Sequence, residues 1–290
     1  MDLDPDTFDR LRPRLKGIAY RMLGSPADAE DVVQDAWLRW HEADRAALDS
    51  AEAWLVTVTT RLAIDRLRAA KIQREHYPGF WLPEPELADG PDRLLEDADN
   101  LSVAFLAVLE RLAPEARAAF LLREVFDVDY DEVARTLGKS EAATRQIVHR
   151  AKVQVRDART RHAVPPERQH QLLHGFAEAM RLGSFAGLQS MLAADAVLIS
   201  DGGGKVPSFG VPLVGADRIA QLFFANHLRH GDGIVLRVVV LNGGWGLLRW
   251  IDGVIESAQS YETDGERIVR IHVQRNPDKL ARLAAAFAAP

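Results

Sequence analysis

The sequence predicts a multidomain protein with two all-α helical domains followed by an α+β domain. Three observations support this architecture: apolar residues recur at helical spacing in the first half, a proline-rich acidic stretch interrupts them, and the last part mixes helical patterns with strands and hairpin signals. A chain of 290 residues suits about two ordinary domains or several small ones. We expect boundaries that give the segments 1–77, 78–100, 101–162 and 163–290.

Charge is distributed unevenly along these segments. The whole chain has a net charge of −6, which taken alone argues against a partner as acidic as DNA. Residues 78–100 carry that same net charge, whereas residues 101–162 are net positive. Prolines and mutually repelling carboxylates predict that 78–100 is an extended linker. The chain has no cysteine, which excludes disulfides, thiol catalysis and zinc sites with Cys ligands.

The first segment contains two predicted helices. Ser25 and Pro26 form the start of one, and its apolar residues predict a buried face comprising Ala29, Val32, Val33, Ala36, Trp37 and Trp40. Its acidic and polar residues, Asp28, Glu30, Asp31, Gln34 and Asp35, fall outside that face, where a solvated surface is the ordinary interpretation. Ser50 begins the second helix, whose polar stripe includes Thr57, Arg61, Arg68 and Lys71, with Asp65 nearby. Such a stripe can neutralise phosphates or simply face water.

The third segment carries a pattern typical of a helix-turn-helix. Two helices separated at 113–114 come first, and a helix beginning at Asp129 with Glu132 in a capping box then ends at Gly138. Ser140 begins the next helix after a short turn. Its predicted inward residues are Ala143, Ile147 and Ala151, and its outward line is Glu141, Arg145, His149, Lys152 and Arg156. A one-sided basic row on a second helix favours DNA binding over a plain helical hairpin.

In their order along the chain, these motifs resemble the extracytoplasmic-function sigma factors, which give bacterial RNA polymerase its promoter specificity. DAEDVVQDAWLRWH is similar to the sigma region 2 helix that docks on the polymerase, and YDEVARTLGKSEAATRQIVHRAK is similar to region 4. The resemblance implies that polymerase is bound through Asp28, Asp31, Gln34, Asp35 and Trp37. It implies minus-ten contacts from Arg61, Asp65 and Arg68, with Arg61 standing where many such factors carry Asn. For the minus-thirty-five element, it and the outward basic row point to Arg145, Gln146, His149, Arg150 and Lys152. Spacing alone puts Gln146 and Arg150 off the main outward line.

The resemblance extends over nearly the whole chain through three shorter motifs. WLPEP (81–85), DGGGK (201–205) and NPDKL (276–280) look like signatures of the subgroup with a SnoaL-like C-terminal extension, a cone-shaped α+β fold. Trp81 and Leu82 are apolar residues in an otherwise acidic linker, and such an exposed pair indicates an apolar contact elsewhere in the protein. We therefore expect interdomain regulatory contacts between the linker and the extension, made by Trp81, Leu82, Pro83, Asn276, Pro277 and Asp278.

The last segment by itself predicts helices followed by a curled, mostly antiparallel sheet. Helical patterns cover 165–182, a short stretch after Ser184, and about 216–229. Predicted strands are 197–200, 234–241, 246–251, 254–262 and 267–274, with hairpin signals at Asp252-Gly253 and Asp264-Gly265. We expect a pocket in such a fold to be lined by Asp201, Lys205, Trp245 and His272.

Other chemistry in this segment is weaker. DGGGK lacks the second glycine spacing and the Ser or Thr of a phosphate-binding loop, so we interpret it as a mobile hairpin. The pairs His170/His174 and His227/His230 lack evident acidic partners, and no metal or cofactor is expected. Relatives of the fold use Asp/His pairs in isomerases and cyclases, but fold alone does not carry an activity.

The sequence therefore predicts a cytoplasmic sigma factor that binds core RNA polymerase and promoter DNA and is modulated in cis by its extension. It is not expected to be an enzyme or to contact a membrane, because the acidic start is unlike a signal peptide and no apolar run is long enough to span. A small-molecule ligand in the extension stays open. Two alternatives also stay open: a ligand-sensing helix-turn-helix regulator, and a DNA-binding module fused to an active isomerase or cyclase.

Overall fold

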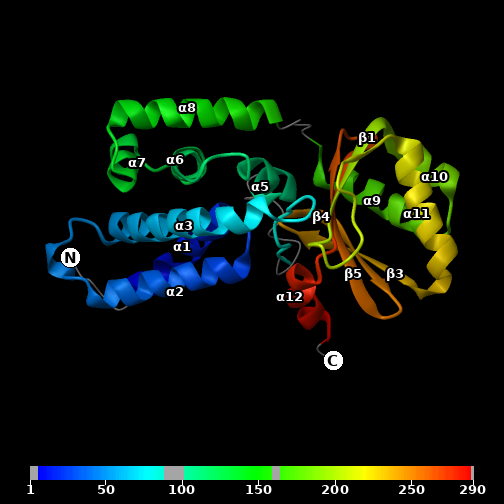
Figure 1. Ribbon diagram of the computed structural model, residues 1–290, viewed down its shortest axis with the longest axis horizontal. Coiled ribbons are helices and arrows are strands. Elements are labelled where there is room, and N and C mark those ends of the chain that lie inside the picture. Colours follow the sequence, from blue (N-terminus) through cyan, green and yellow to red (C-terminus); the bar gives the residue numbers. More distant parts are fainter. Residues whose placement is uncertain (1–5, 88–100, 159–163, 289–290) are drawn as a thin grey trace. The chain divides into compact units, whose positions relative to one another are not determined.

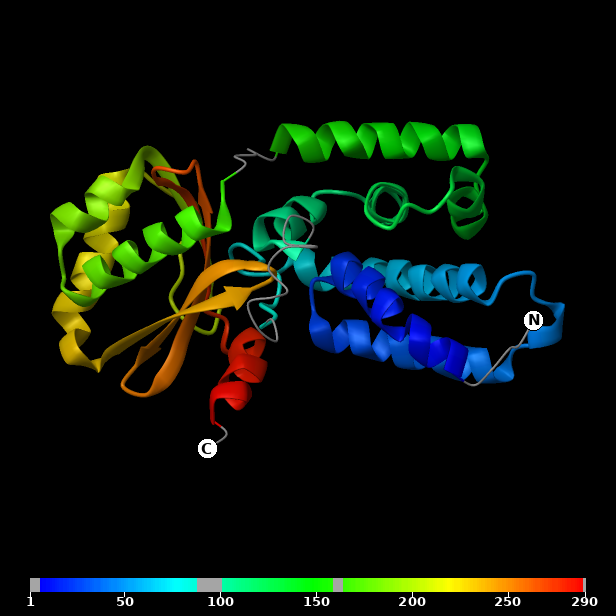
Figure 2. The same cartoon turned by 180° about the vertical axis from the view of Figure 1, so that it is seen from behind.

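The structure is a computed structural model that describes residues 6–87, 101–158 and 164–288. It divides into two compact units, each described by itself below (Figures 1 and 2). The first unit combines Met1–His76 with Val108–Arg159, and the second combines Tyr77–Ala107 with Thr160–Pro290. Most of the acidic linker predicted from the sequence, residues 88–100, lies outside the described residues.

The first unit begins with three long helices, α1 (Asp6–Leu23), α2 (Pro26–Glu42) and α3 (Ala51–Glu75), with a short 3-10 turn at Arg45–Ala47. The predicted caps at α2 and α3 are present. Ser25 Oγ accepts from the Asp28 N–H at 3.3 Å, and Ser50 Oγ accepts from the Ala53 N–H at 3.2 Å. These bonds satisfy amides that a helix start leaves without partners.

The remaining helices of this unit are α6 (Pro114–Glu124), α7 (Tyr130–Leu137) and α8 (Glu141–Ala158). The short helix α5 (Val103–Leu109) begins in the second unit, which takes its residues up to Ala107, and ends in the first. α7 ends at Gly138, whose φ of +63° suits glycine, and the turn into α8 follows as predicted. Asp129 stands at the start of α7, but its side chain makes no capping hydrogen bond, so the predicted capping box is absent.

The two helical regions pack together within this one unit. α6 lies against both α1 and α3, and α7 lies against α3. Arg117 of α6 is 3 % exposed, donates to the Met22 carbonyl at 2.5 Å and pairs with Glu110 at 2.7 Å. A buried guanidinium needs such partners, so Arg117 fixes how α6 sits against the end of α1.

The second unit is a six-stranded sheet with helices. Its elements are α9 (Pro166–Arg181), α10 (Phe185–Met191), β1 (Leu192–Asp201), β2 (Leu213–Val214), α11 (Ala216–His230), a 3-10 turn (Gly231–Gly233), β3 (Ile234–Leu241), β4 (Gly244–Ile251), β5 (Val254–Thr263), β6 (Ile268–Gln274) and α12 (Pro277–Ala288). The strand order is β2-β1-β6-β5-β4-β3, and only the β1–β6 pair is parallel. This agrees with the predicted α+β architecture.

Two apolar clusters hold the sheet. The larger one joins α9, α10 and α11 to the strands through Phe176, Leu188, Ile219, Leu247 and Ile271. The smaller one joins α12 to the strands through Leu283 and Leu248, with Leu87 from the linker packed against it. The sequence pattern did not predict α12, although NPDKL places Pro277 at the first helical position.

Tight turns set the register of the strands. Asp252 and Gly253, predicted as a hairpin, have φ values of +50° and +80°, and Ile251 pairs with Val254 across them. Asn242 and Gly243 form a second such turn, with φ values of +52° and +72°, between β3 and β4. Among the described helices, none combines the length and apolarity that a membrane span requires.

Candidate functional site

The exposed face of α2 carries the acidic and polar side chains that the sequence singled out. Its buried face is made of Pro26, Ala29, Val32, Val33, Ala36 and Trp40. Asp31, Gln34 and Asp35 are exposed, and Asp28 is half-buried. Trp37 was predicted on the buried face; the structure corrects this, because its side chain is 41 % exposed. An exposed indole next to carboxylates is a surface suited to a protein partner.

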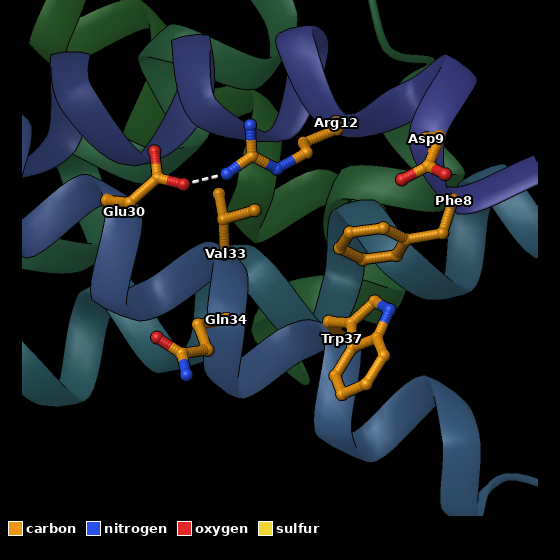
Figure 3. A pocket seen from close by; sticks show the side chains of 7 residues that line it. All are labelled: Phe8, Asp9, Arg12, Glu30, Val33, Gln34 and Trp37. Atoms are coloured by element: carbon orange, nitrogen blue, oxygen red, sulfur yellow. Dashed lines mark hydrogen bonds and ion pairs between the residues drawn. The ribbon is translucent and has the colours of Figure 1, made fainter.

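A groove lies between α1 and this face of α2 (Figure 3), with a volume of about 240 Å³. The rings of Phe8 and Trp37 lie at one end, and an ion pair between Arg12 and Glu30 lies at the other. The remaining lining residues are Asp9, Val33 and Gln34. Asp9 lies beside Phe8, so one end of the groove combines aromatic rings with a carboxylate and the other end holds the ion pair.

The polar stripe of α3 lies where this helix meets α6 and α7. Arg61, Asp65 and Arg68 are all exposed as residues, yet both arginines have partners within the unit. Arg61 donates to the Thr136 carbonyl at 2.9 Å and to the Arg135 carbonyl at 3.1 Å. Arg68 pairs with Asp65 at 3.1 Å and with Glu115 at 2.5 Å. The hydrogen bond from Arg68 lowers the pKa of the Glu115 carboxyl.

The exposed face of α8 is centred differently from the line that spacing predicted. Its buried residues are Thr144, Val148, Ala151 and Val155, while Ala143 and Ile147 are only half-buried. At 100° per residue, Gln146, His149 and Arg150 therefore lie opposite the buried side. The expectation that Gln146 and Arg150 fall off the outward line is wrong for this reason.

Two other residues predicted to contact the promoter, Arg145 and Lys152, lie at the edge of the exposed face of α8. The Arg145 guanidinium lies 4.3 Å from the centre of the Tyr130 ring and also pairs with Glu141. Lys152 pairs with Glu124 of α6 at 2.5 Å. These contacts place their charges beside α6 and α7, whereas all three residues at the centre of the face point away from the unit's core.

In the second unit, residues 77–87, called the strap below, dock on the C-terminal α+β domain through Asp201. This aspartate ends β1 and is 0 % exposed. Its carboxylate accepts hydrogen bonds from the Tyr77 hydroxyl at 2.6 Å and from the Leu82 N–H at 2.9 Å. Burial and the bond to Asp201 raise the pKa of the Tyr77 hydroxyl. The Gly203 N–H at 2.9 Å and the Gln274 amide at 3.2 Å complete the set of donors from neighbouring backbone and strand.

Lys279 of α12 adds a positive charge to the contacts between the strap and Asp201, which together are called the dock below. Its Nζ lies 2.8 Å from the Asp201 carboxylate and donates to the Leu82 carbonyl at 2.7 Å. The same atom lies 4.0 Å from the centre of the Trp81 ring and 5.0 Å from that of the Tyr77 ring. An ammonium between aromatic faces and a buried carboxylate is strongly held, because its partners replace the water it has lost.

The DGGGK loop is closely packed against the strap and α12, which corrects its interpretation as a mobile hairpin. A Cβ on Gly203 would lie 2.3 Å from the Asn276 amide nitrogen, and one on Gly204 would lie 2.5 Å from the Pro78 ring. Both glycines have positive φ, of +61° and +71°. Close approach of the chain and left-handed backbone therefore both require glycine here.

Further contacts run along the strap. Leu82 is 2 % exposed, and the Gln274 amide donates to the carbonyls of Leu82 and Pro83 at 3.2 and 3.3 Å. The Asn276 amide donates to the Tyr77 hydroxyl at 3.0 Å. At the far end, the Asn242 N–H donates to the Glu86 carbonyl at 2.9 Å beside the end of β3.

The structure thus brings four of the six predicted interdomain residues, Trp81, Leu82, Pro83 and Asn276, into one dock. Pro277 opens α12, and Asp278 instead pairs with the exposed Lys205 at 2.5 Å. Sequence reasoning missed Tyr77, Gln274 and Lys279. Lys279 lies inside the NPDKL motif, and the linker motif contains Trp81. A lysine in one motif and an aromatic residue in the other could have predicted a cation–π contact between them.

The four residues predicted to line a pocket have different surroundings. The Asp201 carboxylate is surrounded by hydrogen-bond donors of the protein itself, and Lys205 is exposed on the surface. The structure therefore corrects the prediction that these two residues line a pocket. The Trp245 indole N–H is buried without a hydrogen-bond partner, and its ring lies 4.3 Å from that of His170. His272 is 4 % exposed, with a Glu262 oxygen 3.9 Å from Nδ1. Burial, helped by Arg270, lowers the pKa of His272 to about 3.

The histidine pair on α9 has one short contact. His170 and His174 approach to 3.0 Å between their Nε2 atoms. Within residues 6–87, 101–158 and 164–288, no three His, Asp or Glu side chains gather in a group that could hold a metal ion.

Comparison with known families defines the class of this protein. Residues 7–72, which span α1 to α3, match the model of Sigma-70 region 2, and residues 102–155, which contain the helix-turn-helix, match Sigma-70 region 4. Two such regions in this order, with an acidic exposed helix in the first and a helix-turn-helix in the second, define a sigma factor that directs transcription initiation at promoters.

Similarity to individual proteins shows which group of sigma factors the chain belongs to. It is 35 % identical to the ECF RNA polymerase sigma factor SigJ of Mycobacterium tuberculosis, covering 96 % of this chain and 93 % of SigJ. It is 29 % identical to a probable ECF sigma factor, SigI, of the same organism, covering 94 % and 93 %. The crystal structure of SigJ superposes with a TM-score of 0.78 at 32 % identity, covering 96 % of this chain and 98 % of that one. The chain belongs to the ECF RNA polymerase sigma factors, and its C-terminal α+β domain is of the SigJ type.

Proposed function

We propose that this sigma factor binds core RNA polymerase through α2, reads its promoter through α3 and α8, and is modulated in cis by the strap and the C-terminal domain. The last part is carried by one observation: Asp201 and Lys279 hold the strap from two elements of the domain. In this proposal the domain acts by binding the linker and catalyses nothing itself.

The α2 surface supports the polymerase contact. Asp31, Gln34 and Asp35 are exposed on one side of a helix whose other side is buried, and Trp37 adds an exposed apolar group. Interfaces gain most of their affinity from a few such anchors, with charges setting orientation and association rate. The groove beside Trp37 offers a neighbouring surface of mixed polarity.

The α8 surface supports promoter contacts. Gln146, His149 and Arg150 project from the side of a helix-turn-helix second helix that lies opposite its buried residues. Amide and guanidinium groups at this position can donate to base edges in the major groove, and the flanking cations can contact phosphates. Arg61 and Arg68 of α3 supply further donors for the minus-ten element.

Chain connectivity supports regulation by the strap. α3 ends at Glu75, and the first docked strap residue is Tyr77. Only His76 separates the end of α3 from a side chain held by Asp201, so the dock fixes the chain directly after the promoter-facing helix. A strap that detaches lengthens this tether and changes the freedom of α3 relative to the domain.

Reconstituted transcription with core polymerase tests the proposal. Lys279→Gln removes the cation of the dock, and Lys205→Gln removes an exposed lysine of the same domain as a matched control. We expect Lys279→Gln to change the set or amounts of transcripts several-fold and Lys205→Gln to match the unaltered protein. Equal output from all three proteins would contradict regulation through the strap.

The same assay, together with a turnover assay on candidate ligands, separates the alternatives. A helix-turn-helix regulator would bind promoter DNA without core polymerase and would initiate nothing with it. A fused isomerase or cyclase would lose turnover of its substrate, rather than transcripts, when His272 is replaced.

A further inference from the structure

We propose that Tyr130 and Glu141 are positioning residues that fix the guanidinium of Arg145, so that Arg145 reads a base pair of the minus-thirty-five element. This inference rests on the proposed function, because it takes α8 as the helix that contacts the promoter. It assigns one of the flanking cations of α8 to a base edge instead of a phosphate, and it names the two residues that make this possible.

The ring of Tyr130 lies against the Arg145 guanidinium. Tyr130 is the first residue of α7 and Arg145 lies one turn into α8, so the turn of the helix-turn-helix brings the two side chains together. The guanidinium carbon is 4.3 Å from the centre of the ring, well within the range of a cation–π contact. A guanidinium that is held through its face still presents the N–H groups of its edge to other acceptors.

Glu141 holds the same guanidinium from a second side. It is the first residue of α8, and its carboxylate pairs with Arg145 four residues later. A glutamate that precedes an arginine by four residues is in the favourable order for such a pair, and the helix dipole favours a carboxylate at a helix start. The pair is exposed and therefore weak alone, but together with the ring it restricts the rotamers that the arginine can adopt.

The Tyr130 ring has a second cationic neighbour, which comes from α6. The guanidinium carbon of Arg123 lies 5.2 Å from the centre of the ring. Arg123 also donates to the Val128 carbonyl at 3.1 Å and pairs with Asp127 at 3.0 Å. These contacts tie Arg123 to the segment between α6 and α7, beside the ring. Tyr130 thus connects the body of the helix-turn-helix region to a side chain on its second helix.

A fixed guanidinium can recognise what a free cation cannot. A phosphate contact positions the protein on DNA but carries no sequence information directly. A base edge in the major groove requires donors at a set position and angle, and an arginine that is already ordered loses less conformational entropy when it pairs there. The first turns of a second helix of this kind are the ones that contact base edges, and Arg145 lies in that part of α8.

Promoters in which each base pair of the minus-thirty-five element is varied test this with the protein bound to core polymerase. Arg145→Ala first identifies the base pair at which discrimination depends on Arg145. We expect Tyr130→Leu to reduce discrimination at that base pair by about threefold or more, and to add little when combined with Arg145→Ala. Tyr130→Phe keeps the ring and should keep the discrimination. Full discrimination in Tyr130→Leu, or equal losses in Tyr130→Phe and Tyr130→Leu, would overturn the proposal.

Val133→Ala separates positioning from a general loss of stability. Val133 lies in the same helix as Tyr130 and is 0 % exposed, so its truncation removes core packing and leaves the ring and its two cationic neighbours in place. We expect it to lower output evenly from all promoter variants. Tyr130→Leu leaves the charge of Arg145 unchanged, so the salt dependence of promoter binding should stay the same. An even loss at every position in Tyr130→Leu would overturn the proposal.

Glu141→Gln tests the second positioning residue. Asp131→Asn is its matched control, because Asp131 forms an exposed pair of the same spacing with Arg135. We expect Glu141→Gln to reduce discrimination at the Arg145-dependent base pair by about twofold and Asp131→Asn to leave it unchanged. Equal discrimination in these two proteins would overturn the role of Glu141.

The same measurements distinguish this inference from the proposed function. If the unaltered protein initiates nowhere with core polymerase, the proposed function fails and this inference fails with it. If the unaltered protein initiates and Arg145→Ala keeps full discrimination at every base pair, the proposed function stands and only the inference fails.

Discussion

The carboxylate of Asp201 accepts a hydrogen bond from the backbone N–H of Leu82 at 2.9 Å, across 119 positions of the chain. The contact holds the strap by its main chain, so it fixes the position of the linker whatever side chain stands there. Lys279 closes the arrangement by contacting both the same carboxylate and the Leu82 carbonyl. A buried carboxylate, a cation and one peptide unit of the strap thus form a single network.

Asp201→Asn should destabilise the second unit substantially. Lys279 would be left in a largely buried position without its ion-pair partner, and removing one partner of a buried pair costs about 3 kcal/mol or more of the free energy of unfolding. Urea unfolding followed by tryptophan fluorescence measures this. Asp278→Asn, which breaks an exposed pair with Lys205, should cost less than about 1 kcal/mol. Similar losses of unfolding free energy in the two variants would show that the buried pair of Asp201 and Lys279 does not stabilise the second unit more than the exposed pair does.

Gly203→Ala should loosen the loop that follows Asp201. Its φ of +61° disfavours a side chain, and the new Cβ would lie 2.3 Å from the Asn276 amide. We expect a loss of about 1–3 kcal/mol in unfolding free energy. Gly210→Ala is the control, because nothing lies within 4 Å of its Cβ position. A Gly203→Ala protein as stable as the Gly210→Ala protein would show that the loop is not held as described.

Acid should destabilise the protein partly through His272. Its pKa of about 3 lies below the usual value of 6.5, so between these values the unfolded chain binds a proton that the folded one does not. The free energy of unfolding therefore falls as pH drops below about 6.5, with a slope of up to about 1.4 kcal/mol per pH unit from this group. His272→Gln should show a shallower slope between pH 6 and pH 4. Identical slopes would mean that His272 does not stay neutral in the folded protein.

Trp37→Ala should weaken binding to core polymerase without altering folding. The indole is 41 % exposed, so its loss leaves no cavity, while loss of an aromatic anchor typically reduces affinity about tenfold or more. Leu38→Ala, also at an exposed apolar residue of α2, provides the control. Fluorescence anisotropy with labelled protein measures both dissociation constants. An equal effect of the two substitutions would remove Trp37 from the proposed contact.

Local signals in the sequence predicted most of the fold. Ser25 and Ser50 cap helices as expected, Gly138 ends the first helix of the helix-turn-helix, and Asp252-Gly253 forms its hairpin. These features depend on residues close in the chain, which is why they could be predicted. The family resemblance supplied what local pattern could not, including Gln146 and Arg150 on the exposed face of α8.

Long-range relationships were harder to predict. The dock joins Tyr77, Asp201 and Lys279, and nothing in their local patterns shows that they meet. Arg61 was interpreted as a promoter contact or as part of a solvated face, and its bonds to α7 were missed because backbone carbonyls carry no side-chain signature. Trp37 has helical spacing suited to the core, but its position at the edge of the apolar stripe leaves it exposed.

The most direct test of this account is initiation by the purified protein on a library of promoter fragments from its source organism, with and without core RNA polymerase. The account predicts transcripts with discrete start sites only when both the protein and core polymerase are present, and weak binding to the same fragments by the protein alone. Tight, sequence-specific binding without core polymerase, together with no discrete start sites when core is added, would contradict it.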